Sequence, residues 1–250
     1  MTKADHATDR RILRVTGSDR RDFLQGLISN DINKLTDGLV YAALLSPQGK
    51  YLADFFLLEK GDAILIDAHE TQSASLAQRL GMYKLRADVQ IEQTDIPVYR
   101  GIDPFDAPAD PRHPALGWRH YGPLDHTPAE IDWQAIRVEN LIPESGIELL
   151  ANDSYILEMN FEALNGVDFK KGCYVGQEVT ARMKHKTELR KGLAQVAIQG
   201  QADLGTEITA NSKTVGTLFT QSGTKALAYL RFDRAGADMQ AANARLSYPA

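Results

Sequence analysis

The only cysteine of the chain, Cys173, lies in the segment KKGCYVGQEVTAR. A cysteine acts as a nucleophile or a metal ligand as the thiolate, and neighbouring cations or the amino end of a helix favour that form. Lys170 and Lys171 precede the cysteine, and a helix is predicted to start after Gly176. Gly172 and Gly176 would let the backbone approach a ligand closely. The segment therefore indicates a reactive thiol, with a small buried cysteine as the alternative.

Charge is distributed unevenly around this cysteine. The chain carries a net charge of −5, whereas residues 170–191 contain seven lysines and arginines against two acids. Positive charge confined to one region of an acidic protein favours a defined anionic ligand over DNA or RNA. A solvated basic helix face would explain the charge equally well.

Other chemical patterns are weaker. The sequence contains no phosphate-binding loop and no dinucleotide-binding glycine motif, and its six histidines show no paired metal-ligand spacing. Trp118 and Tyr121 could stack a flat ring beside Arg119, or they could anchor a turn. Asp54 is either a buried carboxylate or a general base, and its position alone does not decide between them.

Composition limits the location of the protein. No stretch approaches the ~20 apolar residues of a membrane helix, and the amino terminus has no apolar core of a secretory signal. A lone cysteine cannot form an internal disulfide. We therefore expect no membrane partner and a reducing compartment, a cytoplasm.

Local patterns predict a mixed α and β organisation. Residues 11–17 alternate as a strand, and apolar spacing predicts a helix from Ser18 through Asp31. The turn SPQGK at 46–50 separates two apolar runs and predicts a hairpin. Further strands are expected at 63–68 and 88–93, and helices are expected around Leu76–Tyr83 and over 132–142.

The second half of the chain contains a proline-rich stretch and then a series of short strand-like runs. Six of the ten prolines lie between Pro104 and Pro128, which predicts a linker or a long loop over a site. After residue 190, short strand-like runs separated by glycine, asparagine and serine predict a small antiparallel β-barrel. We place a domain boundary there, with an α+β region at 1–190 and the barrel at 191–250.

The cysteine segment resembles the signature of the YgfZ family, a branch of the folate-binding superfamily of the glycine-cleavage T-protein. The family pattern Lys-Gly-Cys-aromatic-x-Gly-Gln-Glu is matched by Lys171, Gly172, Cys173, Tyr174, Gly176, Gln177 and Glu178. The segments LRVTGSDRRDFLQGLISNDINKL, YAALLSPQGKYLADFFLL and IRVENLIPESGIEL are similar to other blocks of the family.

This resemblance implies a fold and a function. The expected fold is α+β: a cloverleaf of α+β lobes around a central channel, with a small carboxy-terminal antiparallel β-barrel. The expected function is a folate-binding factor, non-enzymatic, that assembles or repairs iron–sulfur clusters for [4Fe–4S] enzymes. Its implied partners are A-type iron–sulfur carrier proteins and [4Fe–4S] client enzymes, and its implied cofactors are tetrahydrofolate or a derivative and a transient cluster.

The resemblance also implies site residues. Cys173 would be the reactive thiol or a cluster ligand shared with a partner, because a single thiolate cannot hold a cluster, and Lys171 would assist it. Folate would bind in a groove between the lobes, contacted by Asn30, Asp31, Asp54, Trp118, Arg119, Arg137 and Glu139.

Two alternatives remain open. The first is a tetrahydrofolate-dependent one-carbon transferase of the aminomethyl type, in which Asp54 would steer the amine of the folate. T-proteins carry an acidic pair in this hairpin, whereas here the pair reads Ala53-Asp54. The second alternative is a structural cysteine in a protein that only senses folate.

Overall fold

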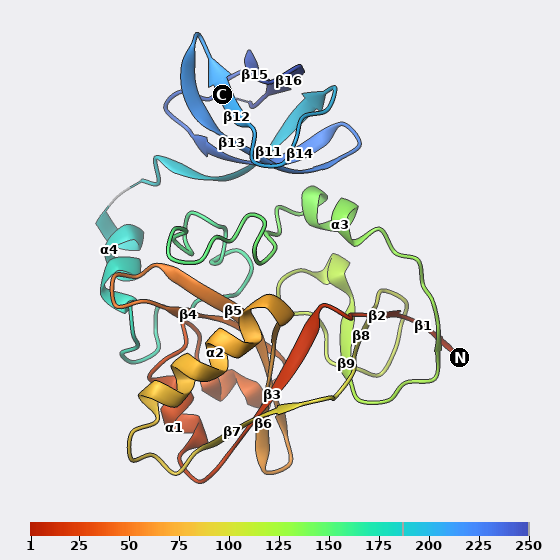
Figure 1. Cartoon of the computed structure of the whole chain (residues 1–250), viewed down its shortest axis with the longest axis vertical. Helices are drawn as coiled ribbons and strands as arrows, with labels where there is room; N and C mark the ends of the chain where they lie inside the picture. The colour runs from red at the N-terminus through yellow and green to blue at the C-terminus, as the bar shows by residue number, and fades with distance from the viewer. Residues whose placement is uncertain (187, 250) are drawn as a thin grey trace.

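The computed structural model describes residues 1–186 and 188–249 and shows two stacked parts (Figure 1). The larger part, which contains the amino terminus, is mixed α and β. The smaller part is a closed β-barrel built from the carboxy-terminal strands. The expected α+β fold with a carboxy-terminal antiparallel barrel is confirmed.

A five-stranded antiparallel sheet with the order β4-β5-β6-β3-β7 forms the centre of the larger part. Its strands are β3 (Arg10–Thr16), β4 (Val40–Leu45), β5 (Tyr51–Lys60), β6 (Ala63–His69) and β7 (Gln90–Thr94). The predicted hairpin is confirmed, because β4 and β5 pair along their length across the 46–50 turn.

Both faces of this sheet are covered, which explains why every residue of β4 is buried. Alternate residues of the strand join two apolar clusters: Val40, Ala42 and Leu44 one, and Tyr41, Ala43 and Leu45 the other. The first cluster also contains buried residues of α1 (Arg20–Gln25), η1 (Ile32–Thr36) and α2 (Glu70–Tyr83).

The first helix is shorter than predicted. It ends at Gln25, and Ile28 forms an isolated β-bridge with Leu44 instead of a further helical turn. It also begins later than predicted, at Arg20, and the Ser18 hydroxyl donates to Asp88 Oδ2 at 2.9 Å. The apolar spacing misled because the chain turns after α1 and still buries Ile28 in the same cluster.

The proline-rich segment is part of the α+β region, so the linker prediction is wrong. Within it lie η2 (Pro114–Leu116) and β9 (Trp118–Tyr121), and β9 pairs with β8 (Val98–Gly101). The strand β8 also pairs with β2 (Asp5–His6), and β1 (Thr2–Lys3) pairs with β10 (His126–Thr127).

The helix predicted over 132–142 is present but shorter, as α3 (Trp133–Glu139). Residues 140–176 then run without helix or long strand as a series of turns against the sheet, up to α4 (Gln177–Lys186). This extended segment carries the cysteine.

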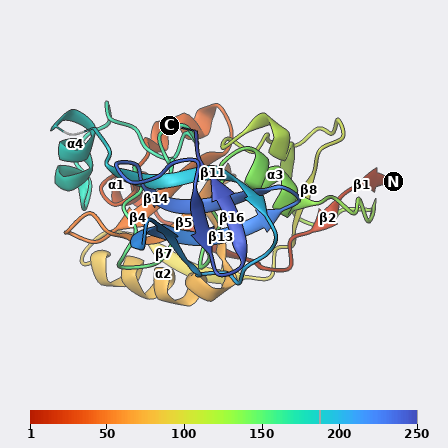
Figure 2. The same cartoon turned by 90° about the horizontal axis from the view of Figure 1, so that it is seen from above.

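The barrel has the closed strand order β11-β14-β13-β12-β15-β16 and is seen from above in Figure 2. Its strands are β11 (Lys191–Gln199), β12 (Glu207–Ala210), β13 (Lys213–Ser222), β14 (Lys225–Arg231), β15 (Met239–Ala241) and β16 (Ala244–Ser247). It encloses its own apolar cluster, which includes Val196, Leu218 and Leu246.

Candidate functional site

The Cys173 loop, defined here as residues 166–176, is bound to the segment that follows α1. Near one end, the Asp168 amide donates to the carbonyl of Ser29 at 3.0 Å. Near the other end, the Val175 amide donates to the carbonyl of Gly26 at 3.3 Å. The backbone of the loop is therefore held on both sides of the cysteine.

Lys171 adds a third attachment between these two. Its side chain is buried, with 7% exposed, and its ammonium donates to three main-chain carbonyls: Gln25 at 2.7 Å, Ile28 at 2.6 Å and Asn30 at 2.9 Å. The same ammonium lies 4.8 Å from the centroid of the Tyr174 ring. These contacts join the Cys173 loop to the end of α1.

Burial lowers the pKa of Lys171 to about 8, although the carboxylates of Asp31 and Asp168 favour the ammonium. Carbonyl acceptors also favour the charged form, because an ammonium donates more strongly than a neutral amine. All three N–H groups are used in these bonds. The geometry therefore makes Lys171 a residue that positions the loop.

Cys173 itself is exposed, so the alternative of a small buried cysteine is wrong. A Cβ added at the preceding Gly172 would meet no atom within 4 Å. The loop thus combines a fixed backbone with an open surface at the cysteine, and another molecule can approach the thiol.

The motif glycine Gly176 serves a contact within the protein. It has a φ of +84°, and a Cβ there would lie 2.6 Å from the Ser46 carbonyl oxygen. On the other side of the same contact, a Cβ at Gly49 would lie 2.7 Å from Val179 Cβ. The start of α4 therefore packs closely on the β4–β5 turn.

The remaining motif residues surround this contact. Tyr174 is buried, and burial raises the pKa of its hydroxyl. The predicted helix begins at Gln177, whose amide donates to the Tyr174 carbonyl at 3.2 Å. Glu178 is exposed and pairs with Arg182 at 3.3 Å.

Asn30 and Asp31, expected to contact folate, are used to shape this same region. Asn30 Nδ2 donates to the carbonyls of Tyr41 at 2.8 Å and Asn165 at 2.7 Å. Asp31 caps η1 by accepting from the Asn33 amide at 3.0 Å. They support the segment whose carbonyls hold the lysine.

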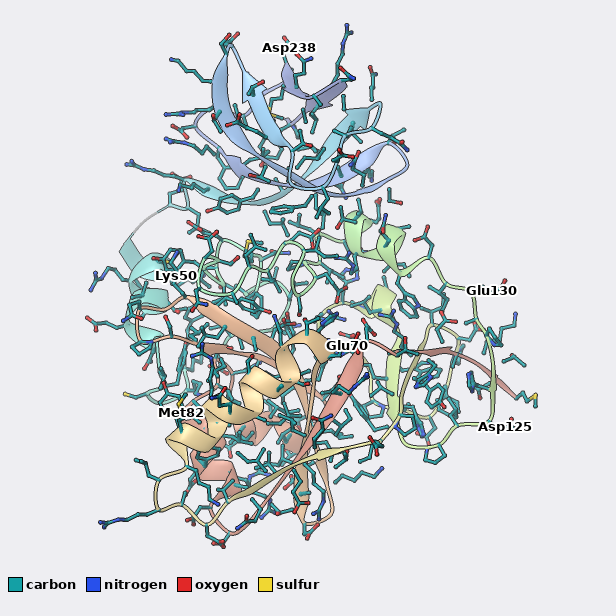
Figure 3. All side chains as sticks on the ribbon, in the orientation of Figure 1. Lys50, Glu70, Met82, Asp125, Glu130 and Asp238 are labelled. Carbon is teal, nitrogen blue, oxygen red and sulfur yellow. The ribbon has the colours of Figure 1, made fainter. Side chains whose placement is uncertain are left out.

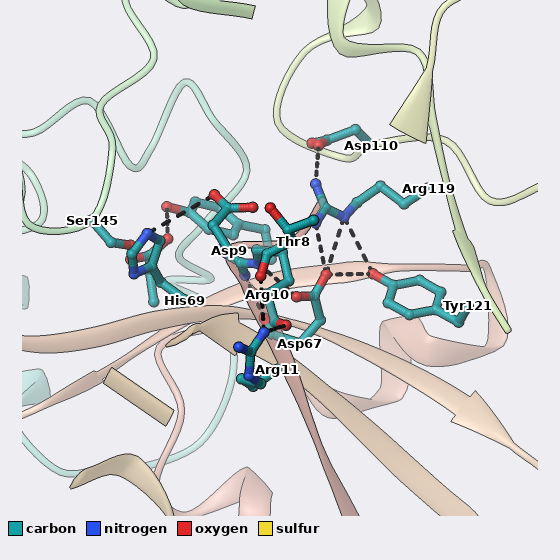
Figure 4. A network of polar contacts seen from close by, with 12 residues as sticks. Thr8, Asp9, Arg10, Arg11, Asp67, His69, Asp110, Arg119, Tyr121 and Ser145 are labelled. Atoms are coloured by element: carbon teal, nitrogen blue, oxygen red, sulfur yellow. Dashed lines mark hydrogen bonds and ion pairs between the residues drawn. The ribbon is translucent and has the colours of Figure 1, made fainter. Parts of the chain in front are cut away.

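A second group of polar side chains is buried between the sheet and β8–β9 (Figure 4). Asp67 is 1% exposed and accepts from Arg10 Nε at 2.6 Å, Arg119 Nη2 at 2.8 Å and the Tyr121 hydroxyl at 3.0 Å. Burial raises the pKa of Asp67, but the two guanidinium groups lower it by more. The pKa of Asp67 therefore lies below its ordinary value.

The group extends to a second carboxylate. Arg112 donates to both oxygens of Asp110, at 3.0 and 2.9 Å, and Arg119 Nη1 lies 3.6 Å from Asp110 Oδ2. Arg112 and Arg119 also lie 4.7 and 4.2 Å from the centroid of the Phe56 ring. We call Arg10, Asp67, Asp110, Arg112, Arg119 and Tyr121 the central cluster.

Asp54 is enclosed by hydroxyl groups. It is 3% exposed; its Oδ1 accepts from the Tyr51 hydroxyl and from Ser145 Oγ, both at 2.5 Å, and its Oδ2 accepts from the Tyr41 hydroxyl at 3.0 Å. Burial, and then the charge of Asp54, raise the pKa values of both tyrosines well above the ordinary range. Both oxygens of the carboxylate are therefore occupied.

Arg137 and Glu139 lie on the same short helix but do not face the same site. Arg137 is buried and pairs with Glu144 at 3.1 Å and Glu148 at 3.2 Å. Glu139 is exposed and pairs with Lys225 of the barrel at 2.7 Å. Through these ion pairs, Arg137 attaches α3 to the segment with Glu144 and Glu148, and Glu139 attaches it to the barrel.

Trp118 is also satisfied within the protein. Its Nε1 donates to the Asp103 carbonyl at 2.6 Å, and its ring lies 4.7 Å from that of Phe105. The stacking platform considered from the sequence is thus occupied by another aromatic side chain.

The residues expected to bind folate do not enclose a space of its size. Arg119 and Arg137 line a common cavity, together with Arg100 and Trp133, but its volume is only about 10 Å³. Sites for molecules of folate's size span roughly 300–1,000 Å³. The guanidinium of Arg100 lies 4.4 Å from the Trp133 ring, and burial beside Arg119 lowers its pKa to about 10. This cavity, which only Arg119 and Arg137 of the expected folate residues line, is smaller than such sites.

Sequence reasoning missed most of the central cluster. Arg10, Asp67, Asp110 and Arg112 were not singled out. The one local signal was Asp67, a charged residue inside the apolar run AILIDA, because a carboxylate in a buried strand requires a cation.

Within residues 1–186 and 188–249, no group of three or more histidine, cysteine, aspartate or glutamate residues is arranged to hold a metal ion. In the same part of the chain, no helix is long and apolar enough to cross a membrane.

Comparison with known proteins finds a matching family model and relatives that share one name. Residues 190–249 match the family model described as CAF17, C-terminal beta-barrel domain. The mitochondrial iron–sulfur cluster assembly factor IBA57 homolog of Pyricularia oryzae is 33% identical over 210 residues, covering 73% of this chain and 54% of that protein. Mitochondrial IBA57 of Mus musculus is 28% identical, covering 89% of this chain and 75% of that protein.

Among solved structures, the glycine cleavage system aminomethyltransferase T from Bartonella henselae superposes with a TM-score of 0.74, covering 100% of this chain and 86% of that one. Its identity of 12% supports the fold alone. The chain spans about half the length of the fungal relatives, at 54%, 55% and 51% of each.

Proposed function

The chain belongs to the IBA57/CAF17 family, and we propose from this that it takes part in assembling or repairing iron–sulfur clusters in other proteins. The observation that carries the proposal is the exposed thiol of Cys173 on a backbone held at both sides. A fixed backbone presents the thiol in one place, and the open surface at Gly172 leaves room for a partner.

The cluster is the cargo of this proposal, and a partner must supply most of its ligands. Iron–sulfur clusters are held by several cysteine thiolates, and this chain has one cysteine. We propose A-type carrier proteins and [4Fe–4S] client enzymes as the partners. Cys173 acts as a ligand during the transfer, or its thiolate attacks a partner's disulfide, which forms a mixed disulfide and frees one partner thiol. Two small-molecule thiols then release Cys173 and the second partner thiol and leave as their own disulfide.

The transferase alternative receives less support. It needs Asp54 to reach a substrate amine, whereas both Asp54 oxygens accept hydrogen bonds from buried hydroxyl groups. Folate is left out of the proposed function, because the small central cavity would have to come apart to admit it. Calorimetric titration with tetrahydrofolate tests this point. Saturable heat of binding that is lost in Arg119→Gln would show that folate binds at the central cavity.

For the compartment we propose a reducing one. The free thiol of Cys173 would be oxidised elsewhere, and the names of the relatives place them in mitochondria. A bacterial cytoplasm and a mitochondrial matrix both meet this requirement.

The proposal is tested by returning variants to a cell that lacks its own family member. The activity of a [4Fe–4S] enzyme, normalised to its protein level, is expected to be restored by the parent and by Gly172→Ala. The glycine variant is the matched control, because its added Cβ meets no atom within 4 Å. Cys173→Ser is expected to restore nothing, although it is made at the parental level.

A second measurement separates the two roles of the thiol. The purified protein is mixed anaerobically with an A-type carrier, and bound iron and sulfide are measured in the complex. A cluster held by the parent complex and lost with Cys173→Ser supports ligation. Full enzyme activity in cells carrying Cys173→Ser would overturn the proposed function.

A further inference from the structure

The carboxy end of α2 carries a cluster of apolar side chains on the surface. Met82, Tyr83 and Leu85 are 61%, 37% and 89% exposed, and their Cα atoms lie within about 11 Å of one another because only three peptide units separate the first from the last. Met82 is labelled in Figure 3, at the end of α2 that lies farther from the barrel. We call residues 79–87 the α2 tip.

The fold does not use these three side chains. Leu76 and Leu80 of the same helix are fully buried in the cluster that α2 covers, whereas Met82, Tyr83 and Leu85 belong to none of the apolar clusters of the described residues. The described residues include seven large apolar side chains that are exposed, and three of the seven lie at the α2 tip. Single exposed apolar residues are ordinary, but a group of them favours a contact with another molecule.

Leu85 also has a backbone conformation that suits leucine poorly. It follows Lys84, which caps the end of α2, and its φ is +45°. Glycine or asparagine usually takes this left-handed position after a helix, because other side chains are strained there. A leucine that is both strained and exposed adds nothing to the fold, which favours a role outside the chain.

The α2 tip is basic as well as apolar. It contains Arg79, Lys84 and Arg86 and no acid. The guanidinium groups of Arg79 and Arg86 form no hydrogen bond or ion pair with any residue that the structure describes. The next residue after the tip, Asp88, accepts from the Ser18 hydroxyl at 2.9 Å. Unpaired cations beside exposed apolar side chains complement a surface that carries carboxylates around an apolar recess.

Two other occupants fit this surface less well. A second copy of the chain, meeting the first tip to tip, would bring three cations against three. A helix that lies on a membrane buries a long apolar face, whereas the exposed residues Thr71, Ser75 and Gln78 make the outer side of α2 polar. The apolar surface is confined to the end of the helix, which suits a recess in a protein.

We propose that the α2 tip docks a partner protein whose surface is acidic around an apolar recess. Met82 and Leu85 enter the recess, and the three cations of the tip face the carboxylates around it. This docking goes beyond the proposed role of Cys173 and does not require the thiol.

Photo-cross-linking in the cells of origin identifies the partner. The substitution Tyr83→p-benzoylphenylalanine keeps an aromatic ring at the tip, and the same substitution at Lys213, an exposed residue of the barrel, is the control. Mass spectrometry is expected to find one partner protein, attached at position 83 only, through a segment rich in aspartate and glutamate. Cross-linking to lipid, to a second copy of the chain or to no molecule would overturn the proposal.

The identified partner is then purified and titrated against variants in the absence of iron and sulfide. Leu85→Asn removes the apolar side chain and places a residue suited to the left-handed conformation. Its urea midpoint should therefore be at or above that of the parent, while its dissociation constant rises by about tenfold or more. Leu204→Asn is the matched control, because Leu204 is 57% exposed and lies in the barrel part.

The charge is tested with Arg86→Glu, which should also raise the dissociation constant by about tenfold or more. Lys213→Glu makes the same change of charge at an exposed residue without a described ion pair, and it should bind as the parent does. Equal losses in the tip variants and their controls, or an affinity of the parent that added salt leaves unchanged, would overturn the proposal. Cys173→Ser is expected to bind this partner as the parent does, so this test and that of the proposed function fail separately.

Discussion

The central cluster and the Cys173 loop use buried cations in different ways. In the central cluster, Arg10, Arg112 and Arg119 pair with two buried carboxylates, and almost no space remains between the side chains. In the Cys173 loop, the single buried cation, Lys171, binds carbonyl groups and has no carboxylate within ion-pair distance in the described structure. One arrangement fills the interior, and the other fixes a backbone while its cysteine stays exposed.

This difference predicts where substitutions act. A carboxylate removed from the central cluster leaves guanidinium groups buried without a partner, which is costly for folding. A change at the exposed thiol removes no buried contact and should cost little. The two regions should therefore separate stability from function.

The largest effect is expected from Asp67→Ala. The substitution leaves Arg10 and Arg119 without their shared carboxylate, in a place where Asp67 is 1% exposed. Removing one partner of a buried pair costs about 3–5 kcal/mol. Urea unfolding followed by circular dichroism at neutral pH measures the loss.

Asp62→Ala is the matched control. Asp62 pairs with Arg14 at 2.8 Å, but its side chain is 82% exposed, and exposed pairs contribute about 0–1 kcal/mol. Equal losses in the free energy of unfolding for the two variants would show that the buried ion pairs of the central cluster stabilise the fold no more than an exposed pair does.

Acid should destabilise the protein through the same carboxylates. The pKa values of Asp67 and Asp110 are lower in the folded protein than the ordinary 3.8, because nearby arginines outweigh the opposing effect of burial. The unfolded chain therefore takes up protons first as the pH falls. Their contribution is fully present above pH 3.8 and is lost as the pH falls through the lower folded pKa values.

Urea unfolding between about pH 6 and pH 3 measures this loss. Asp67→Asn removes one of the two titrating groups, so its free energy of unfolding should fall less steeply below about pH 4 than that of the parent. Parallel curves for both proteins would mean that other carboxylates cause the acid sensitivity.

Much of the fold was predictable because its signals are local. The β4–β5 hairpin follows from a proline and a glycine within SPQGK, and the first four barrel strands follow from short alternating runs between turn residues. The first helix was predicted to be too long, because Ile28 is buried whether or not it is helical. The strand β9 has four residues in a proline-rich stretch, which is too short to show a period.

The sites were less predictable because their partners are distant in the chain. Asp67 and Arg119 are separated by 52 positions, and Lys171 bonds to the Ile28 carbonyl over 143 positions. Lys171 suggested a cation acting on the neighbouring thiol, whereas its ammonium binds carbonyl groups of another segment. The exposure of Cys173 was predictable, because polar and glycine neighbours leave little apolar surface to bury it.

An intermediate effect is expected from Lys171→Met. Methionine fills a similar volume but leaves the carbonyls of Gln25, Ile28 and Asn30 without their donor. Unsatisfied buried acceptors cost about 1–3 kcal/mol, and hydrogen exchange of the amides of residues 166–176 should become faster.

Lys170→Met is the control for this change, because Lys170 is adjacent and exposed. Its effect on exchange and stability should be within about 0.5 kcal/mol of zero. Unchanged protection of the loop in Lys171→Met would mean that its backbone bonds to Ser29 and Gly26 suffice to hold it.

The smallest effect on stability is expected from Cys173→Ser. The thiol is exposed and makes no hydrogen bond among the described residues, so the free energy of unfolding should change by less than about 0.5 kcal/mol. For the same reason, iodoacetamide should alkylate the folded parent about as fast as the protein in urea, within roughly threefold, because folding places no barrier before the thiol. Mass spectrometry at timed intervals measures both rates. A folded protein that resists alkylation, or a serine variant as unstable as Lys171→Met, would mean that the thiol is packed inside the loop. The contrast with the central cluster would then disappear, and Cys173 would be one more structural residue.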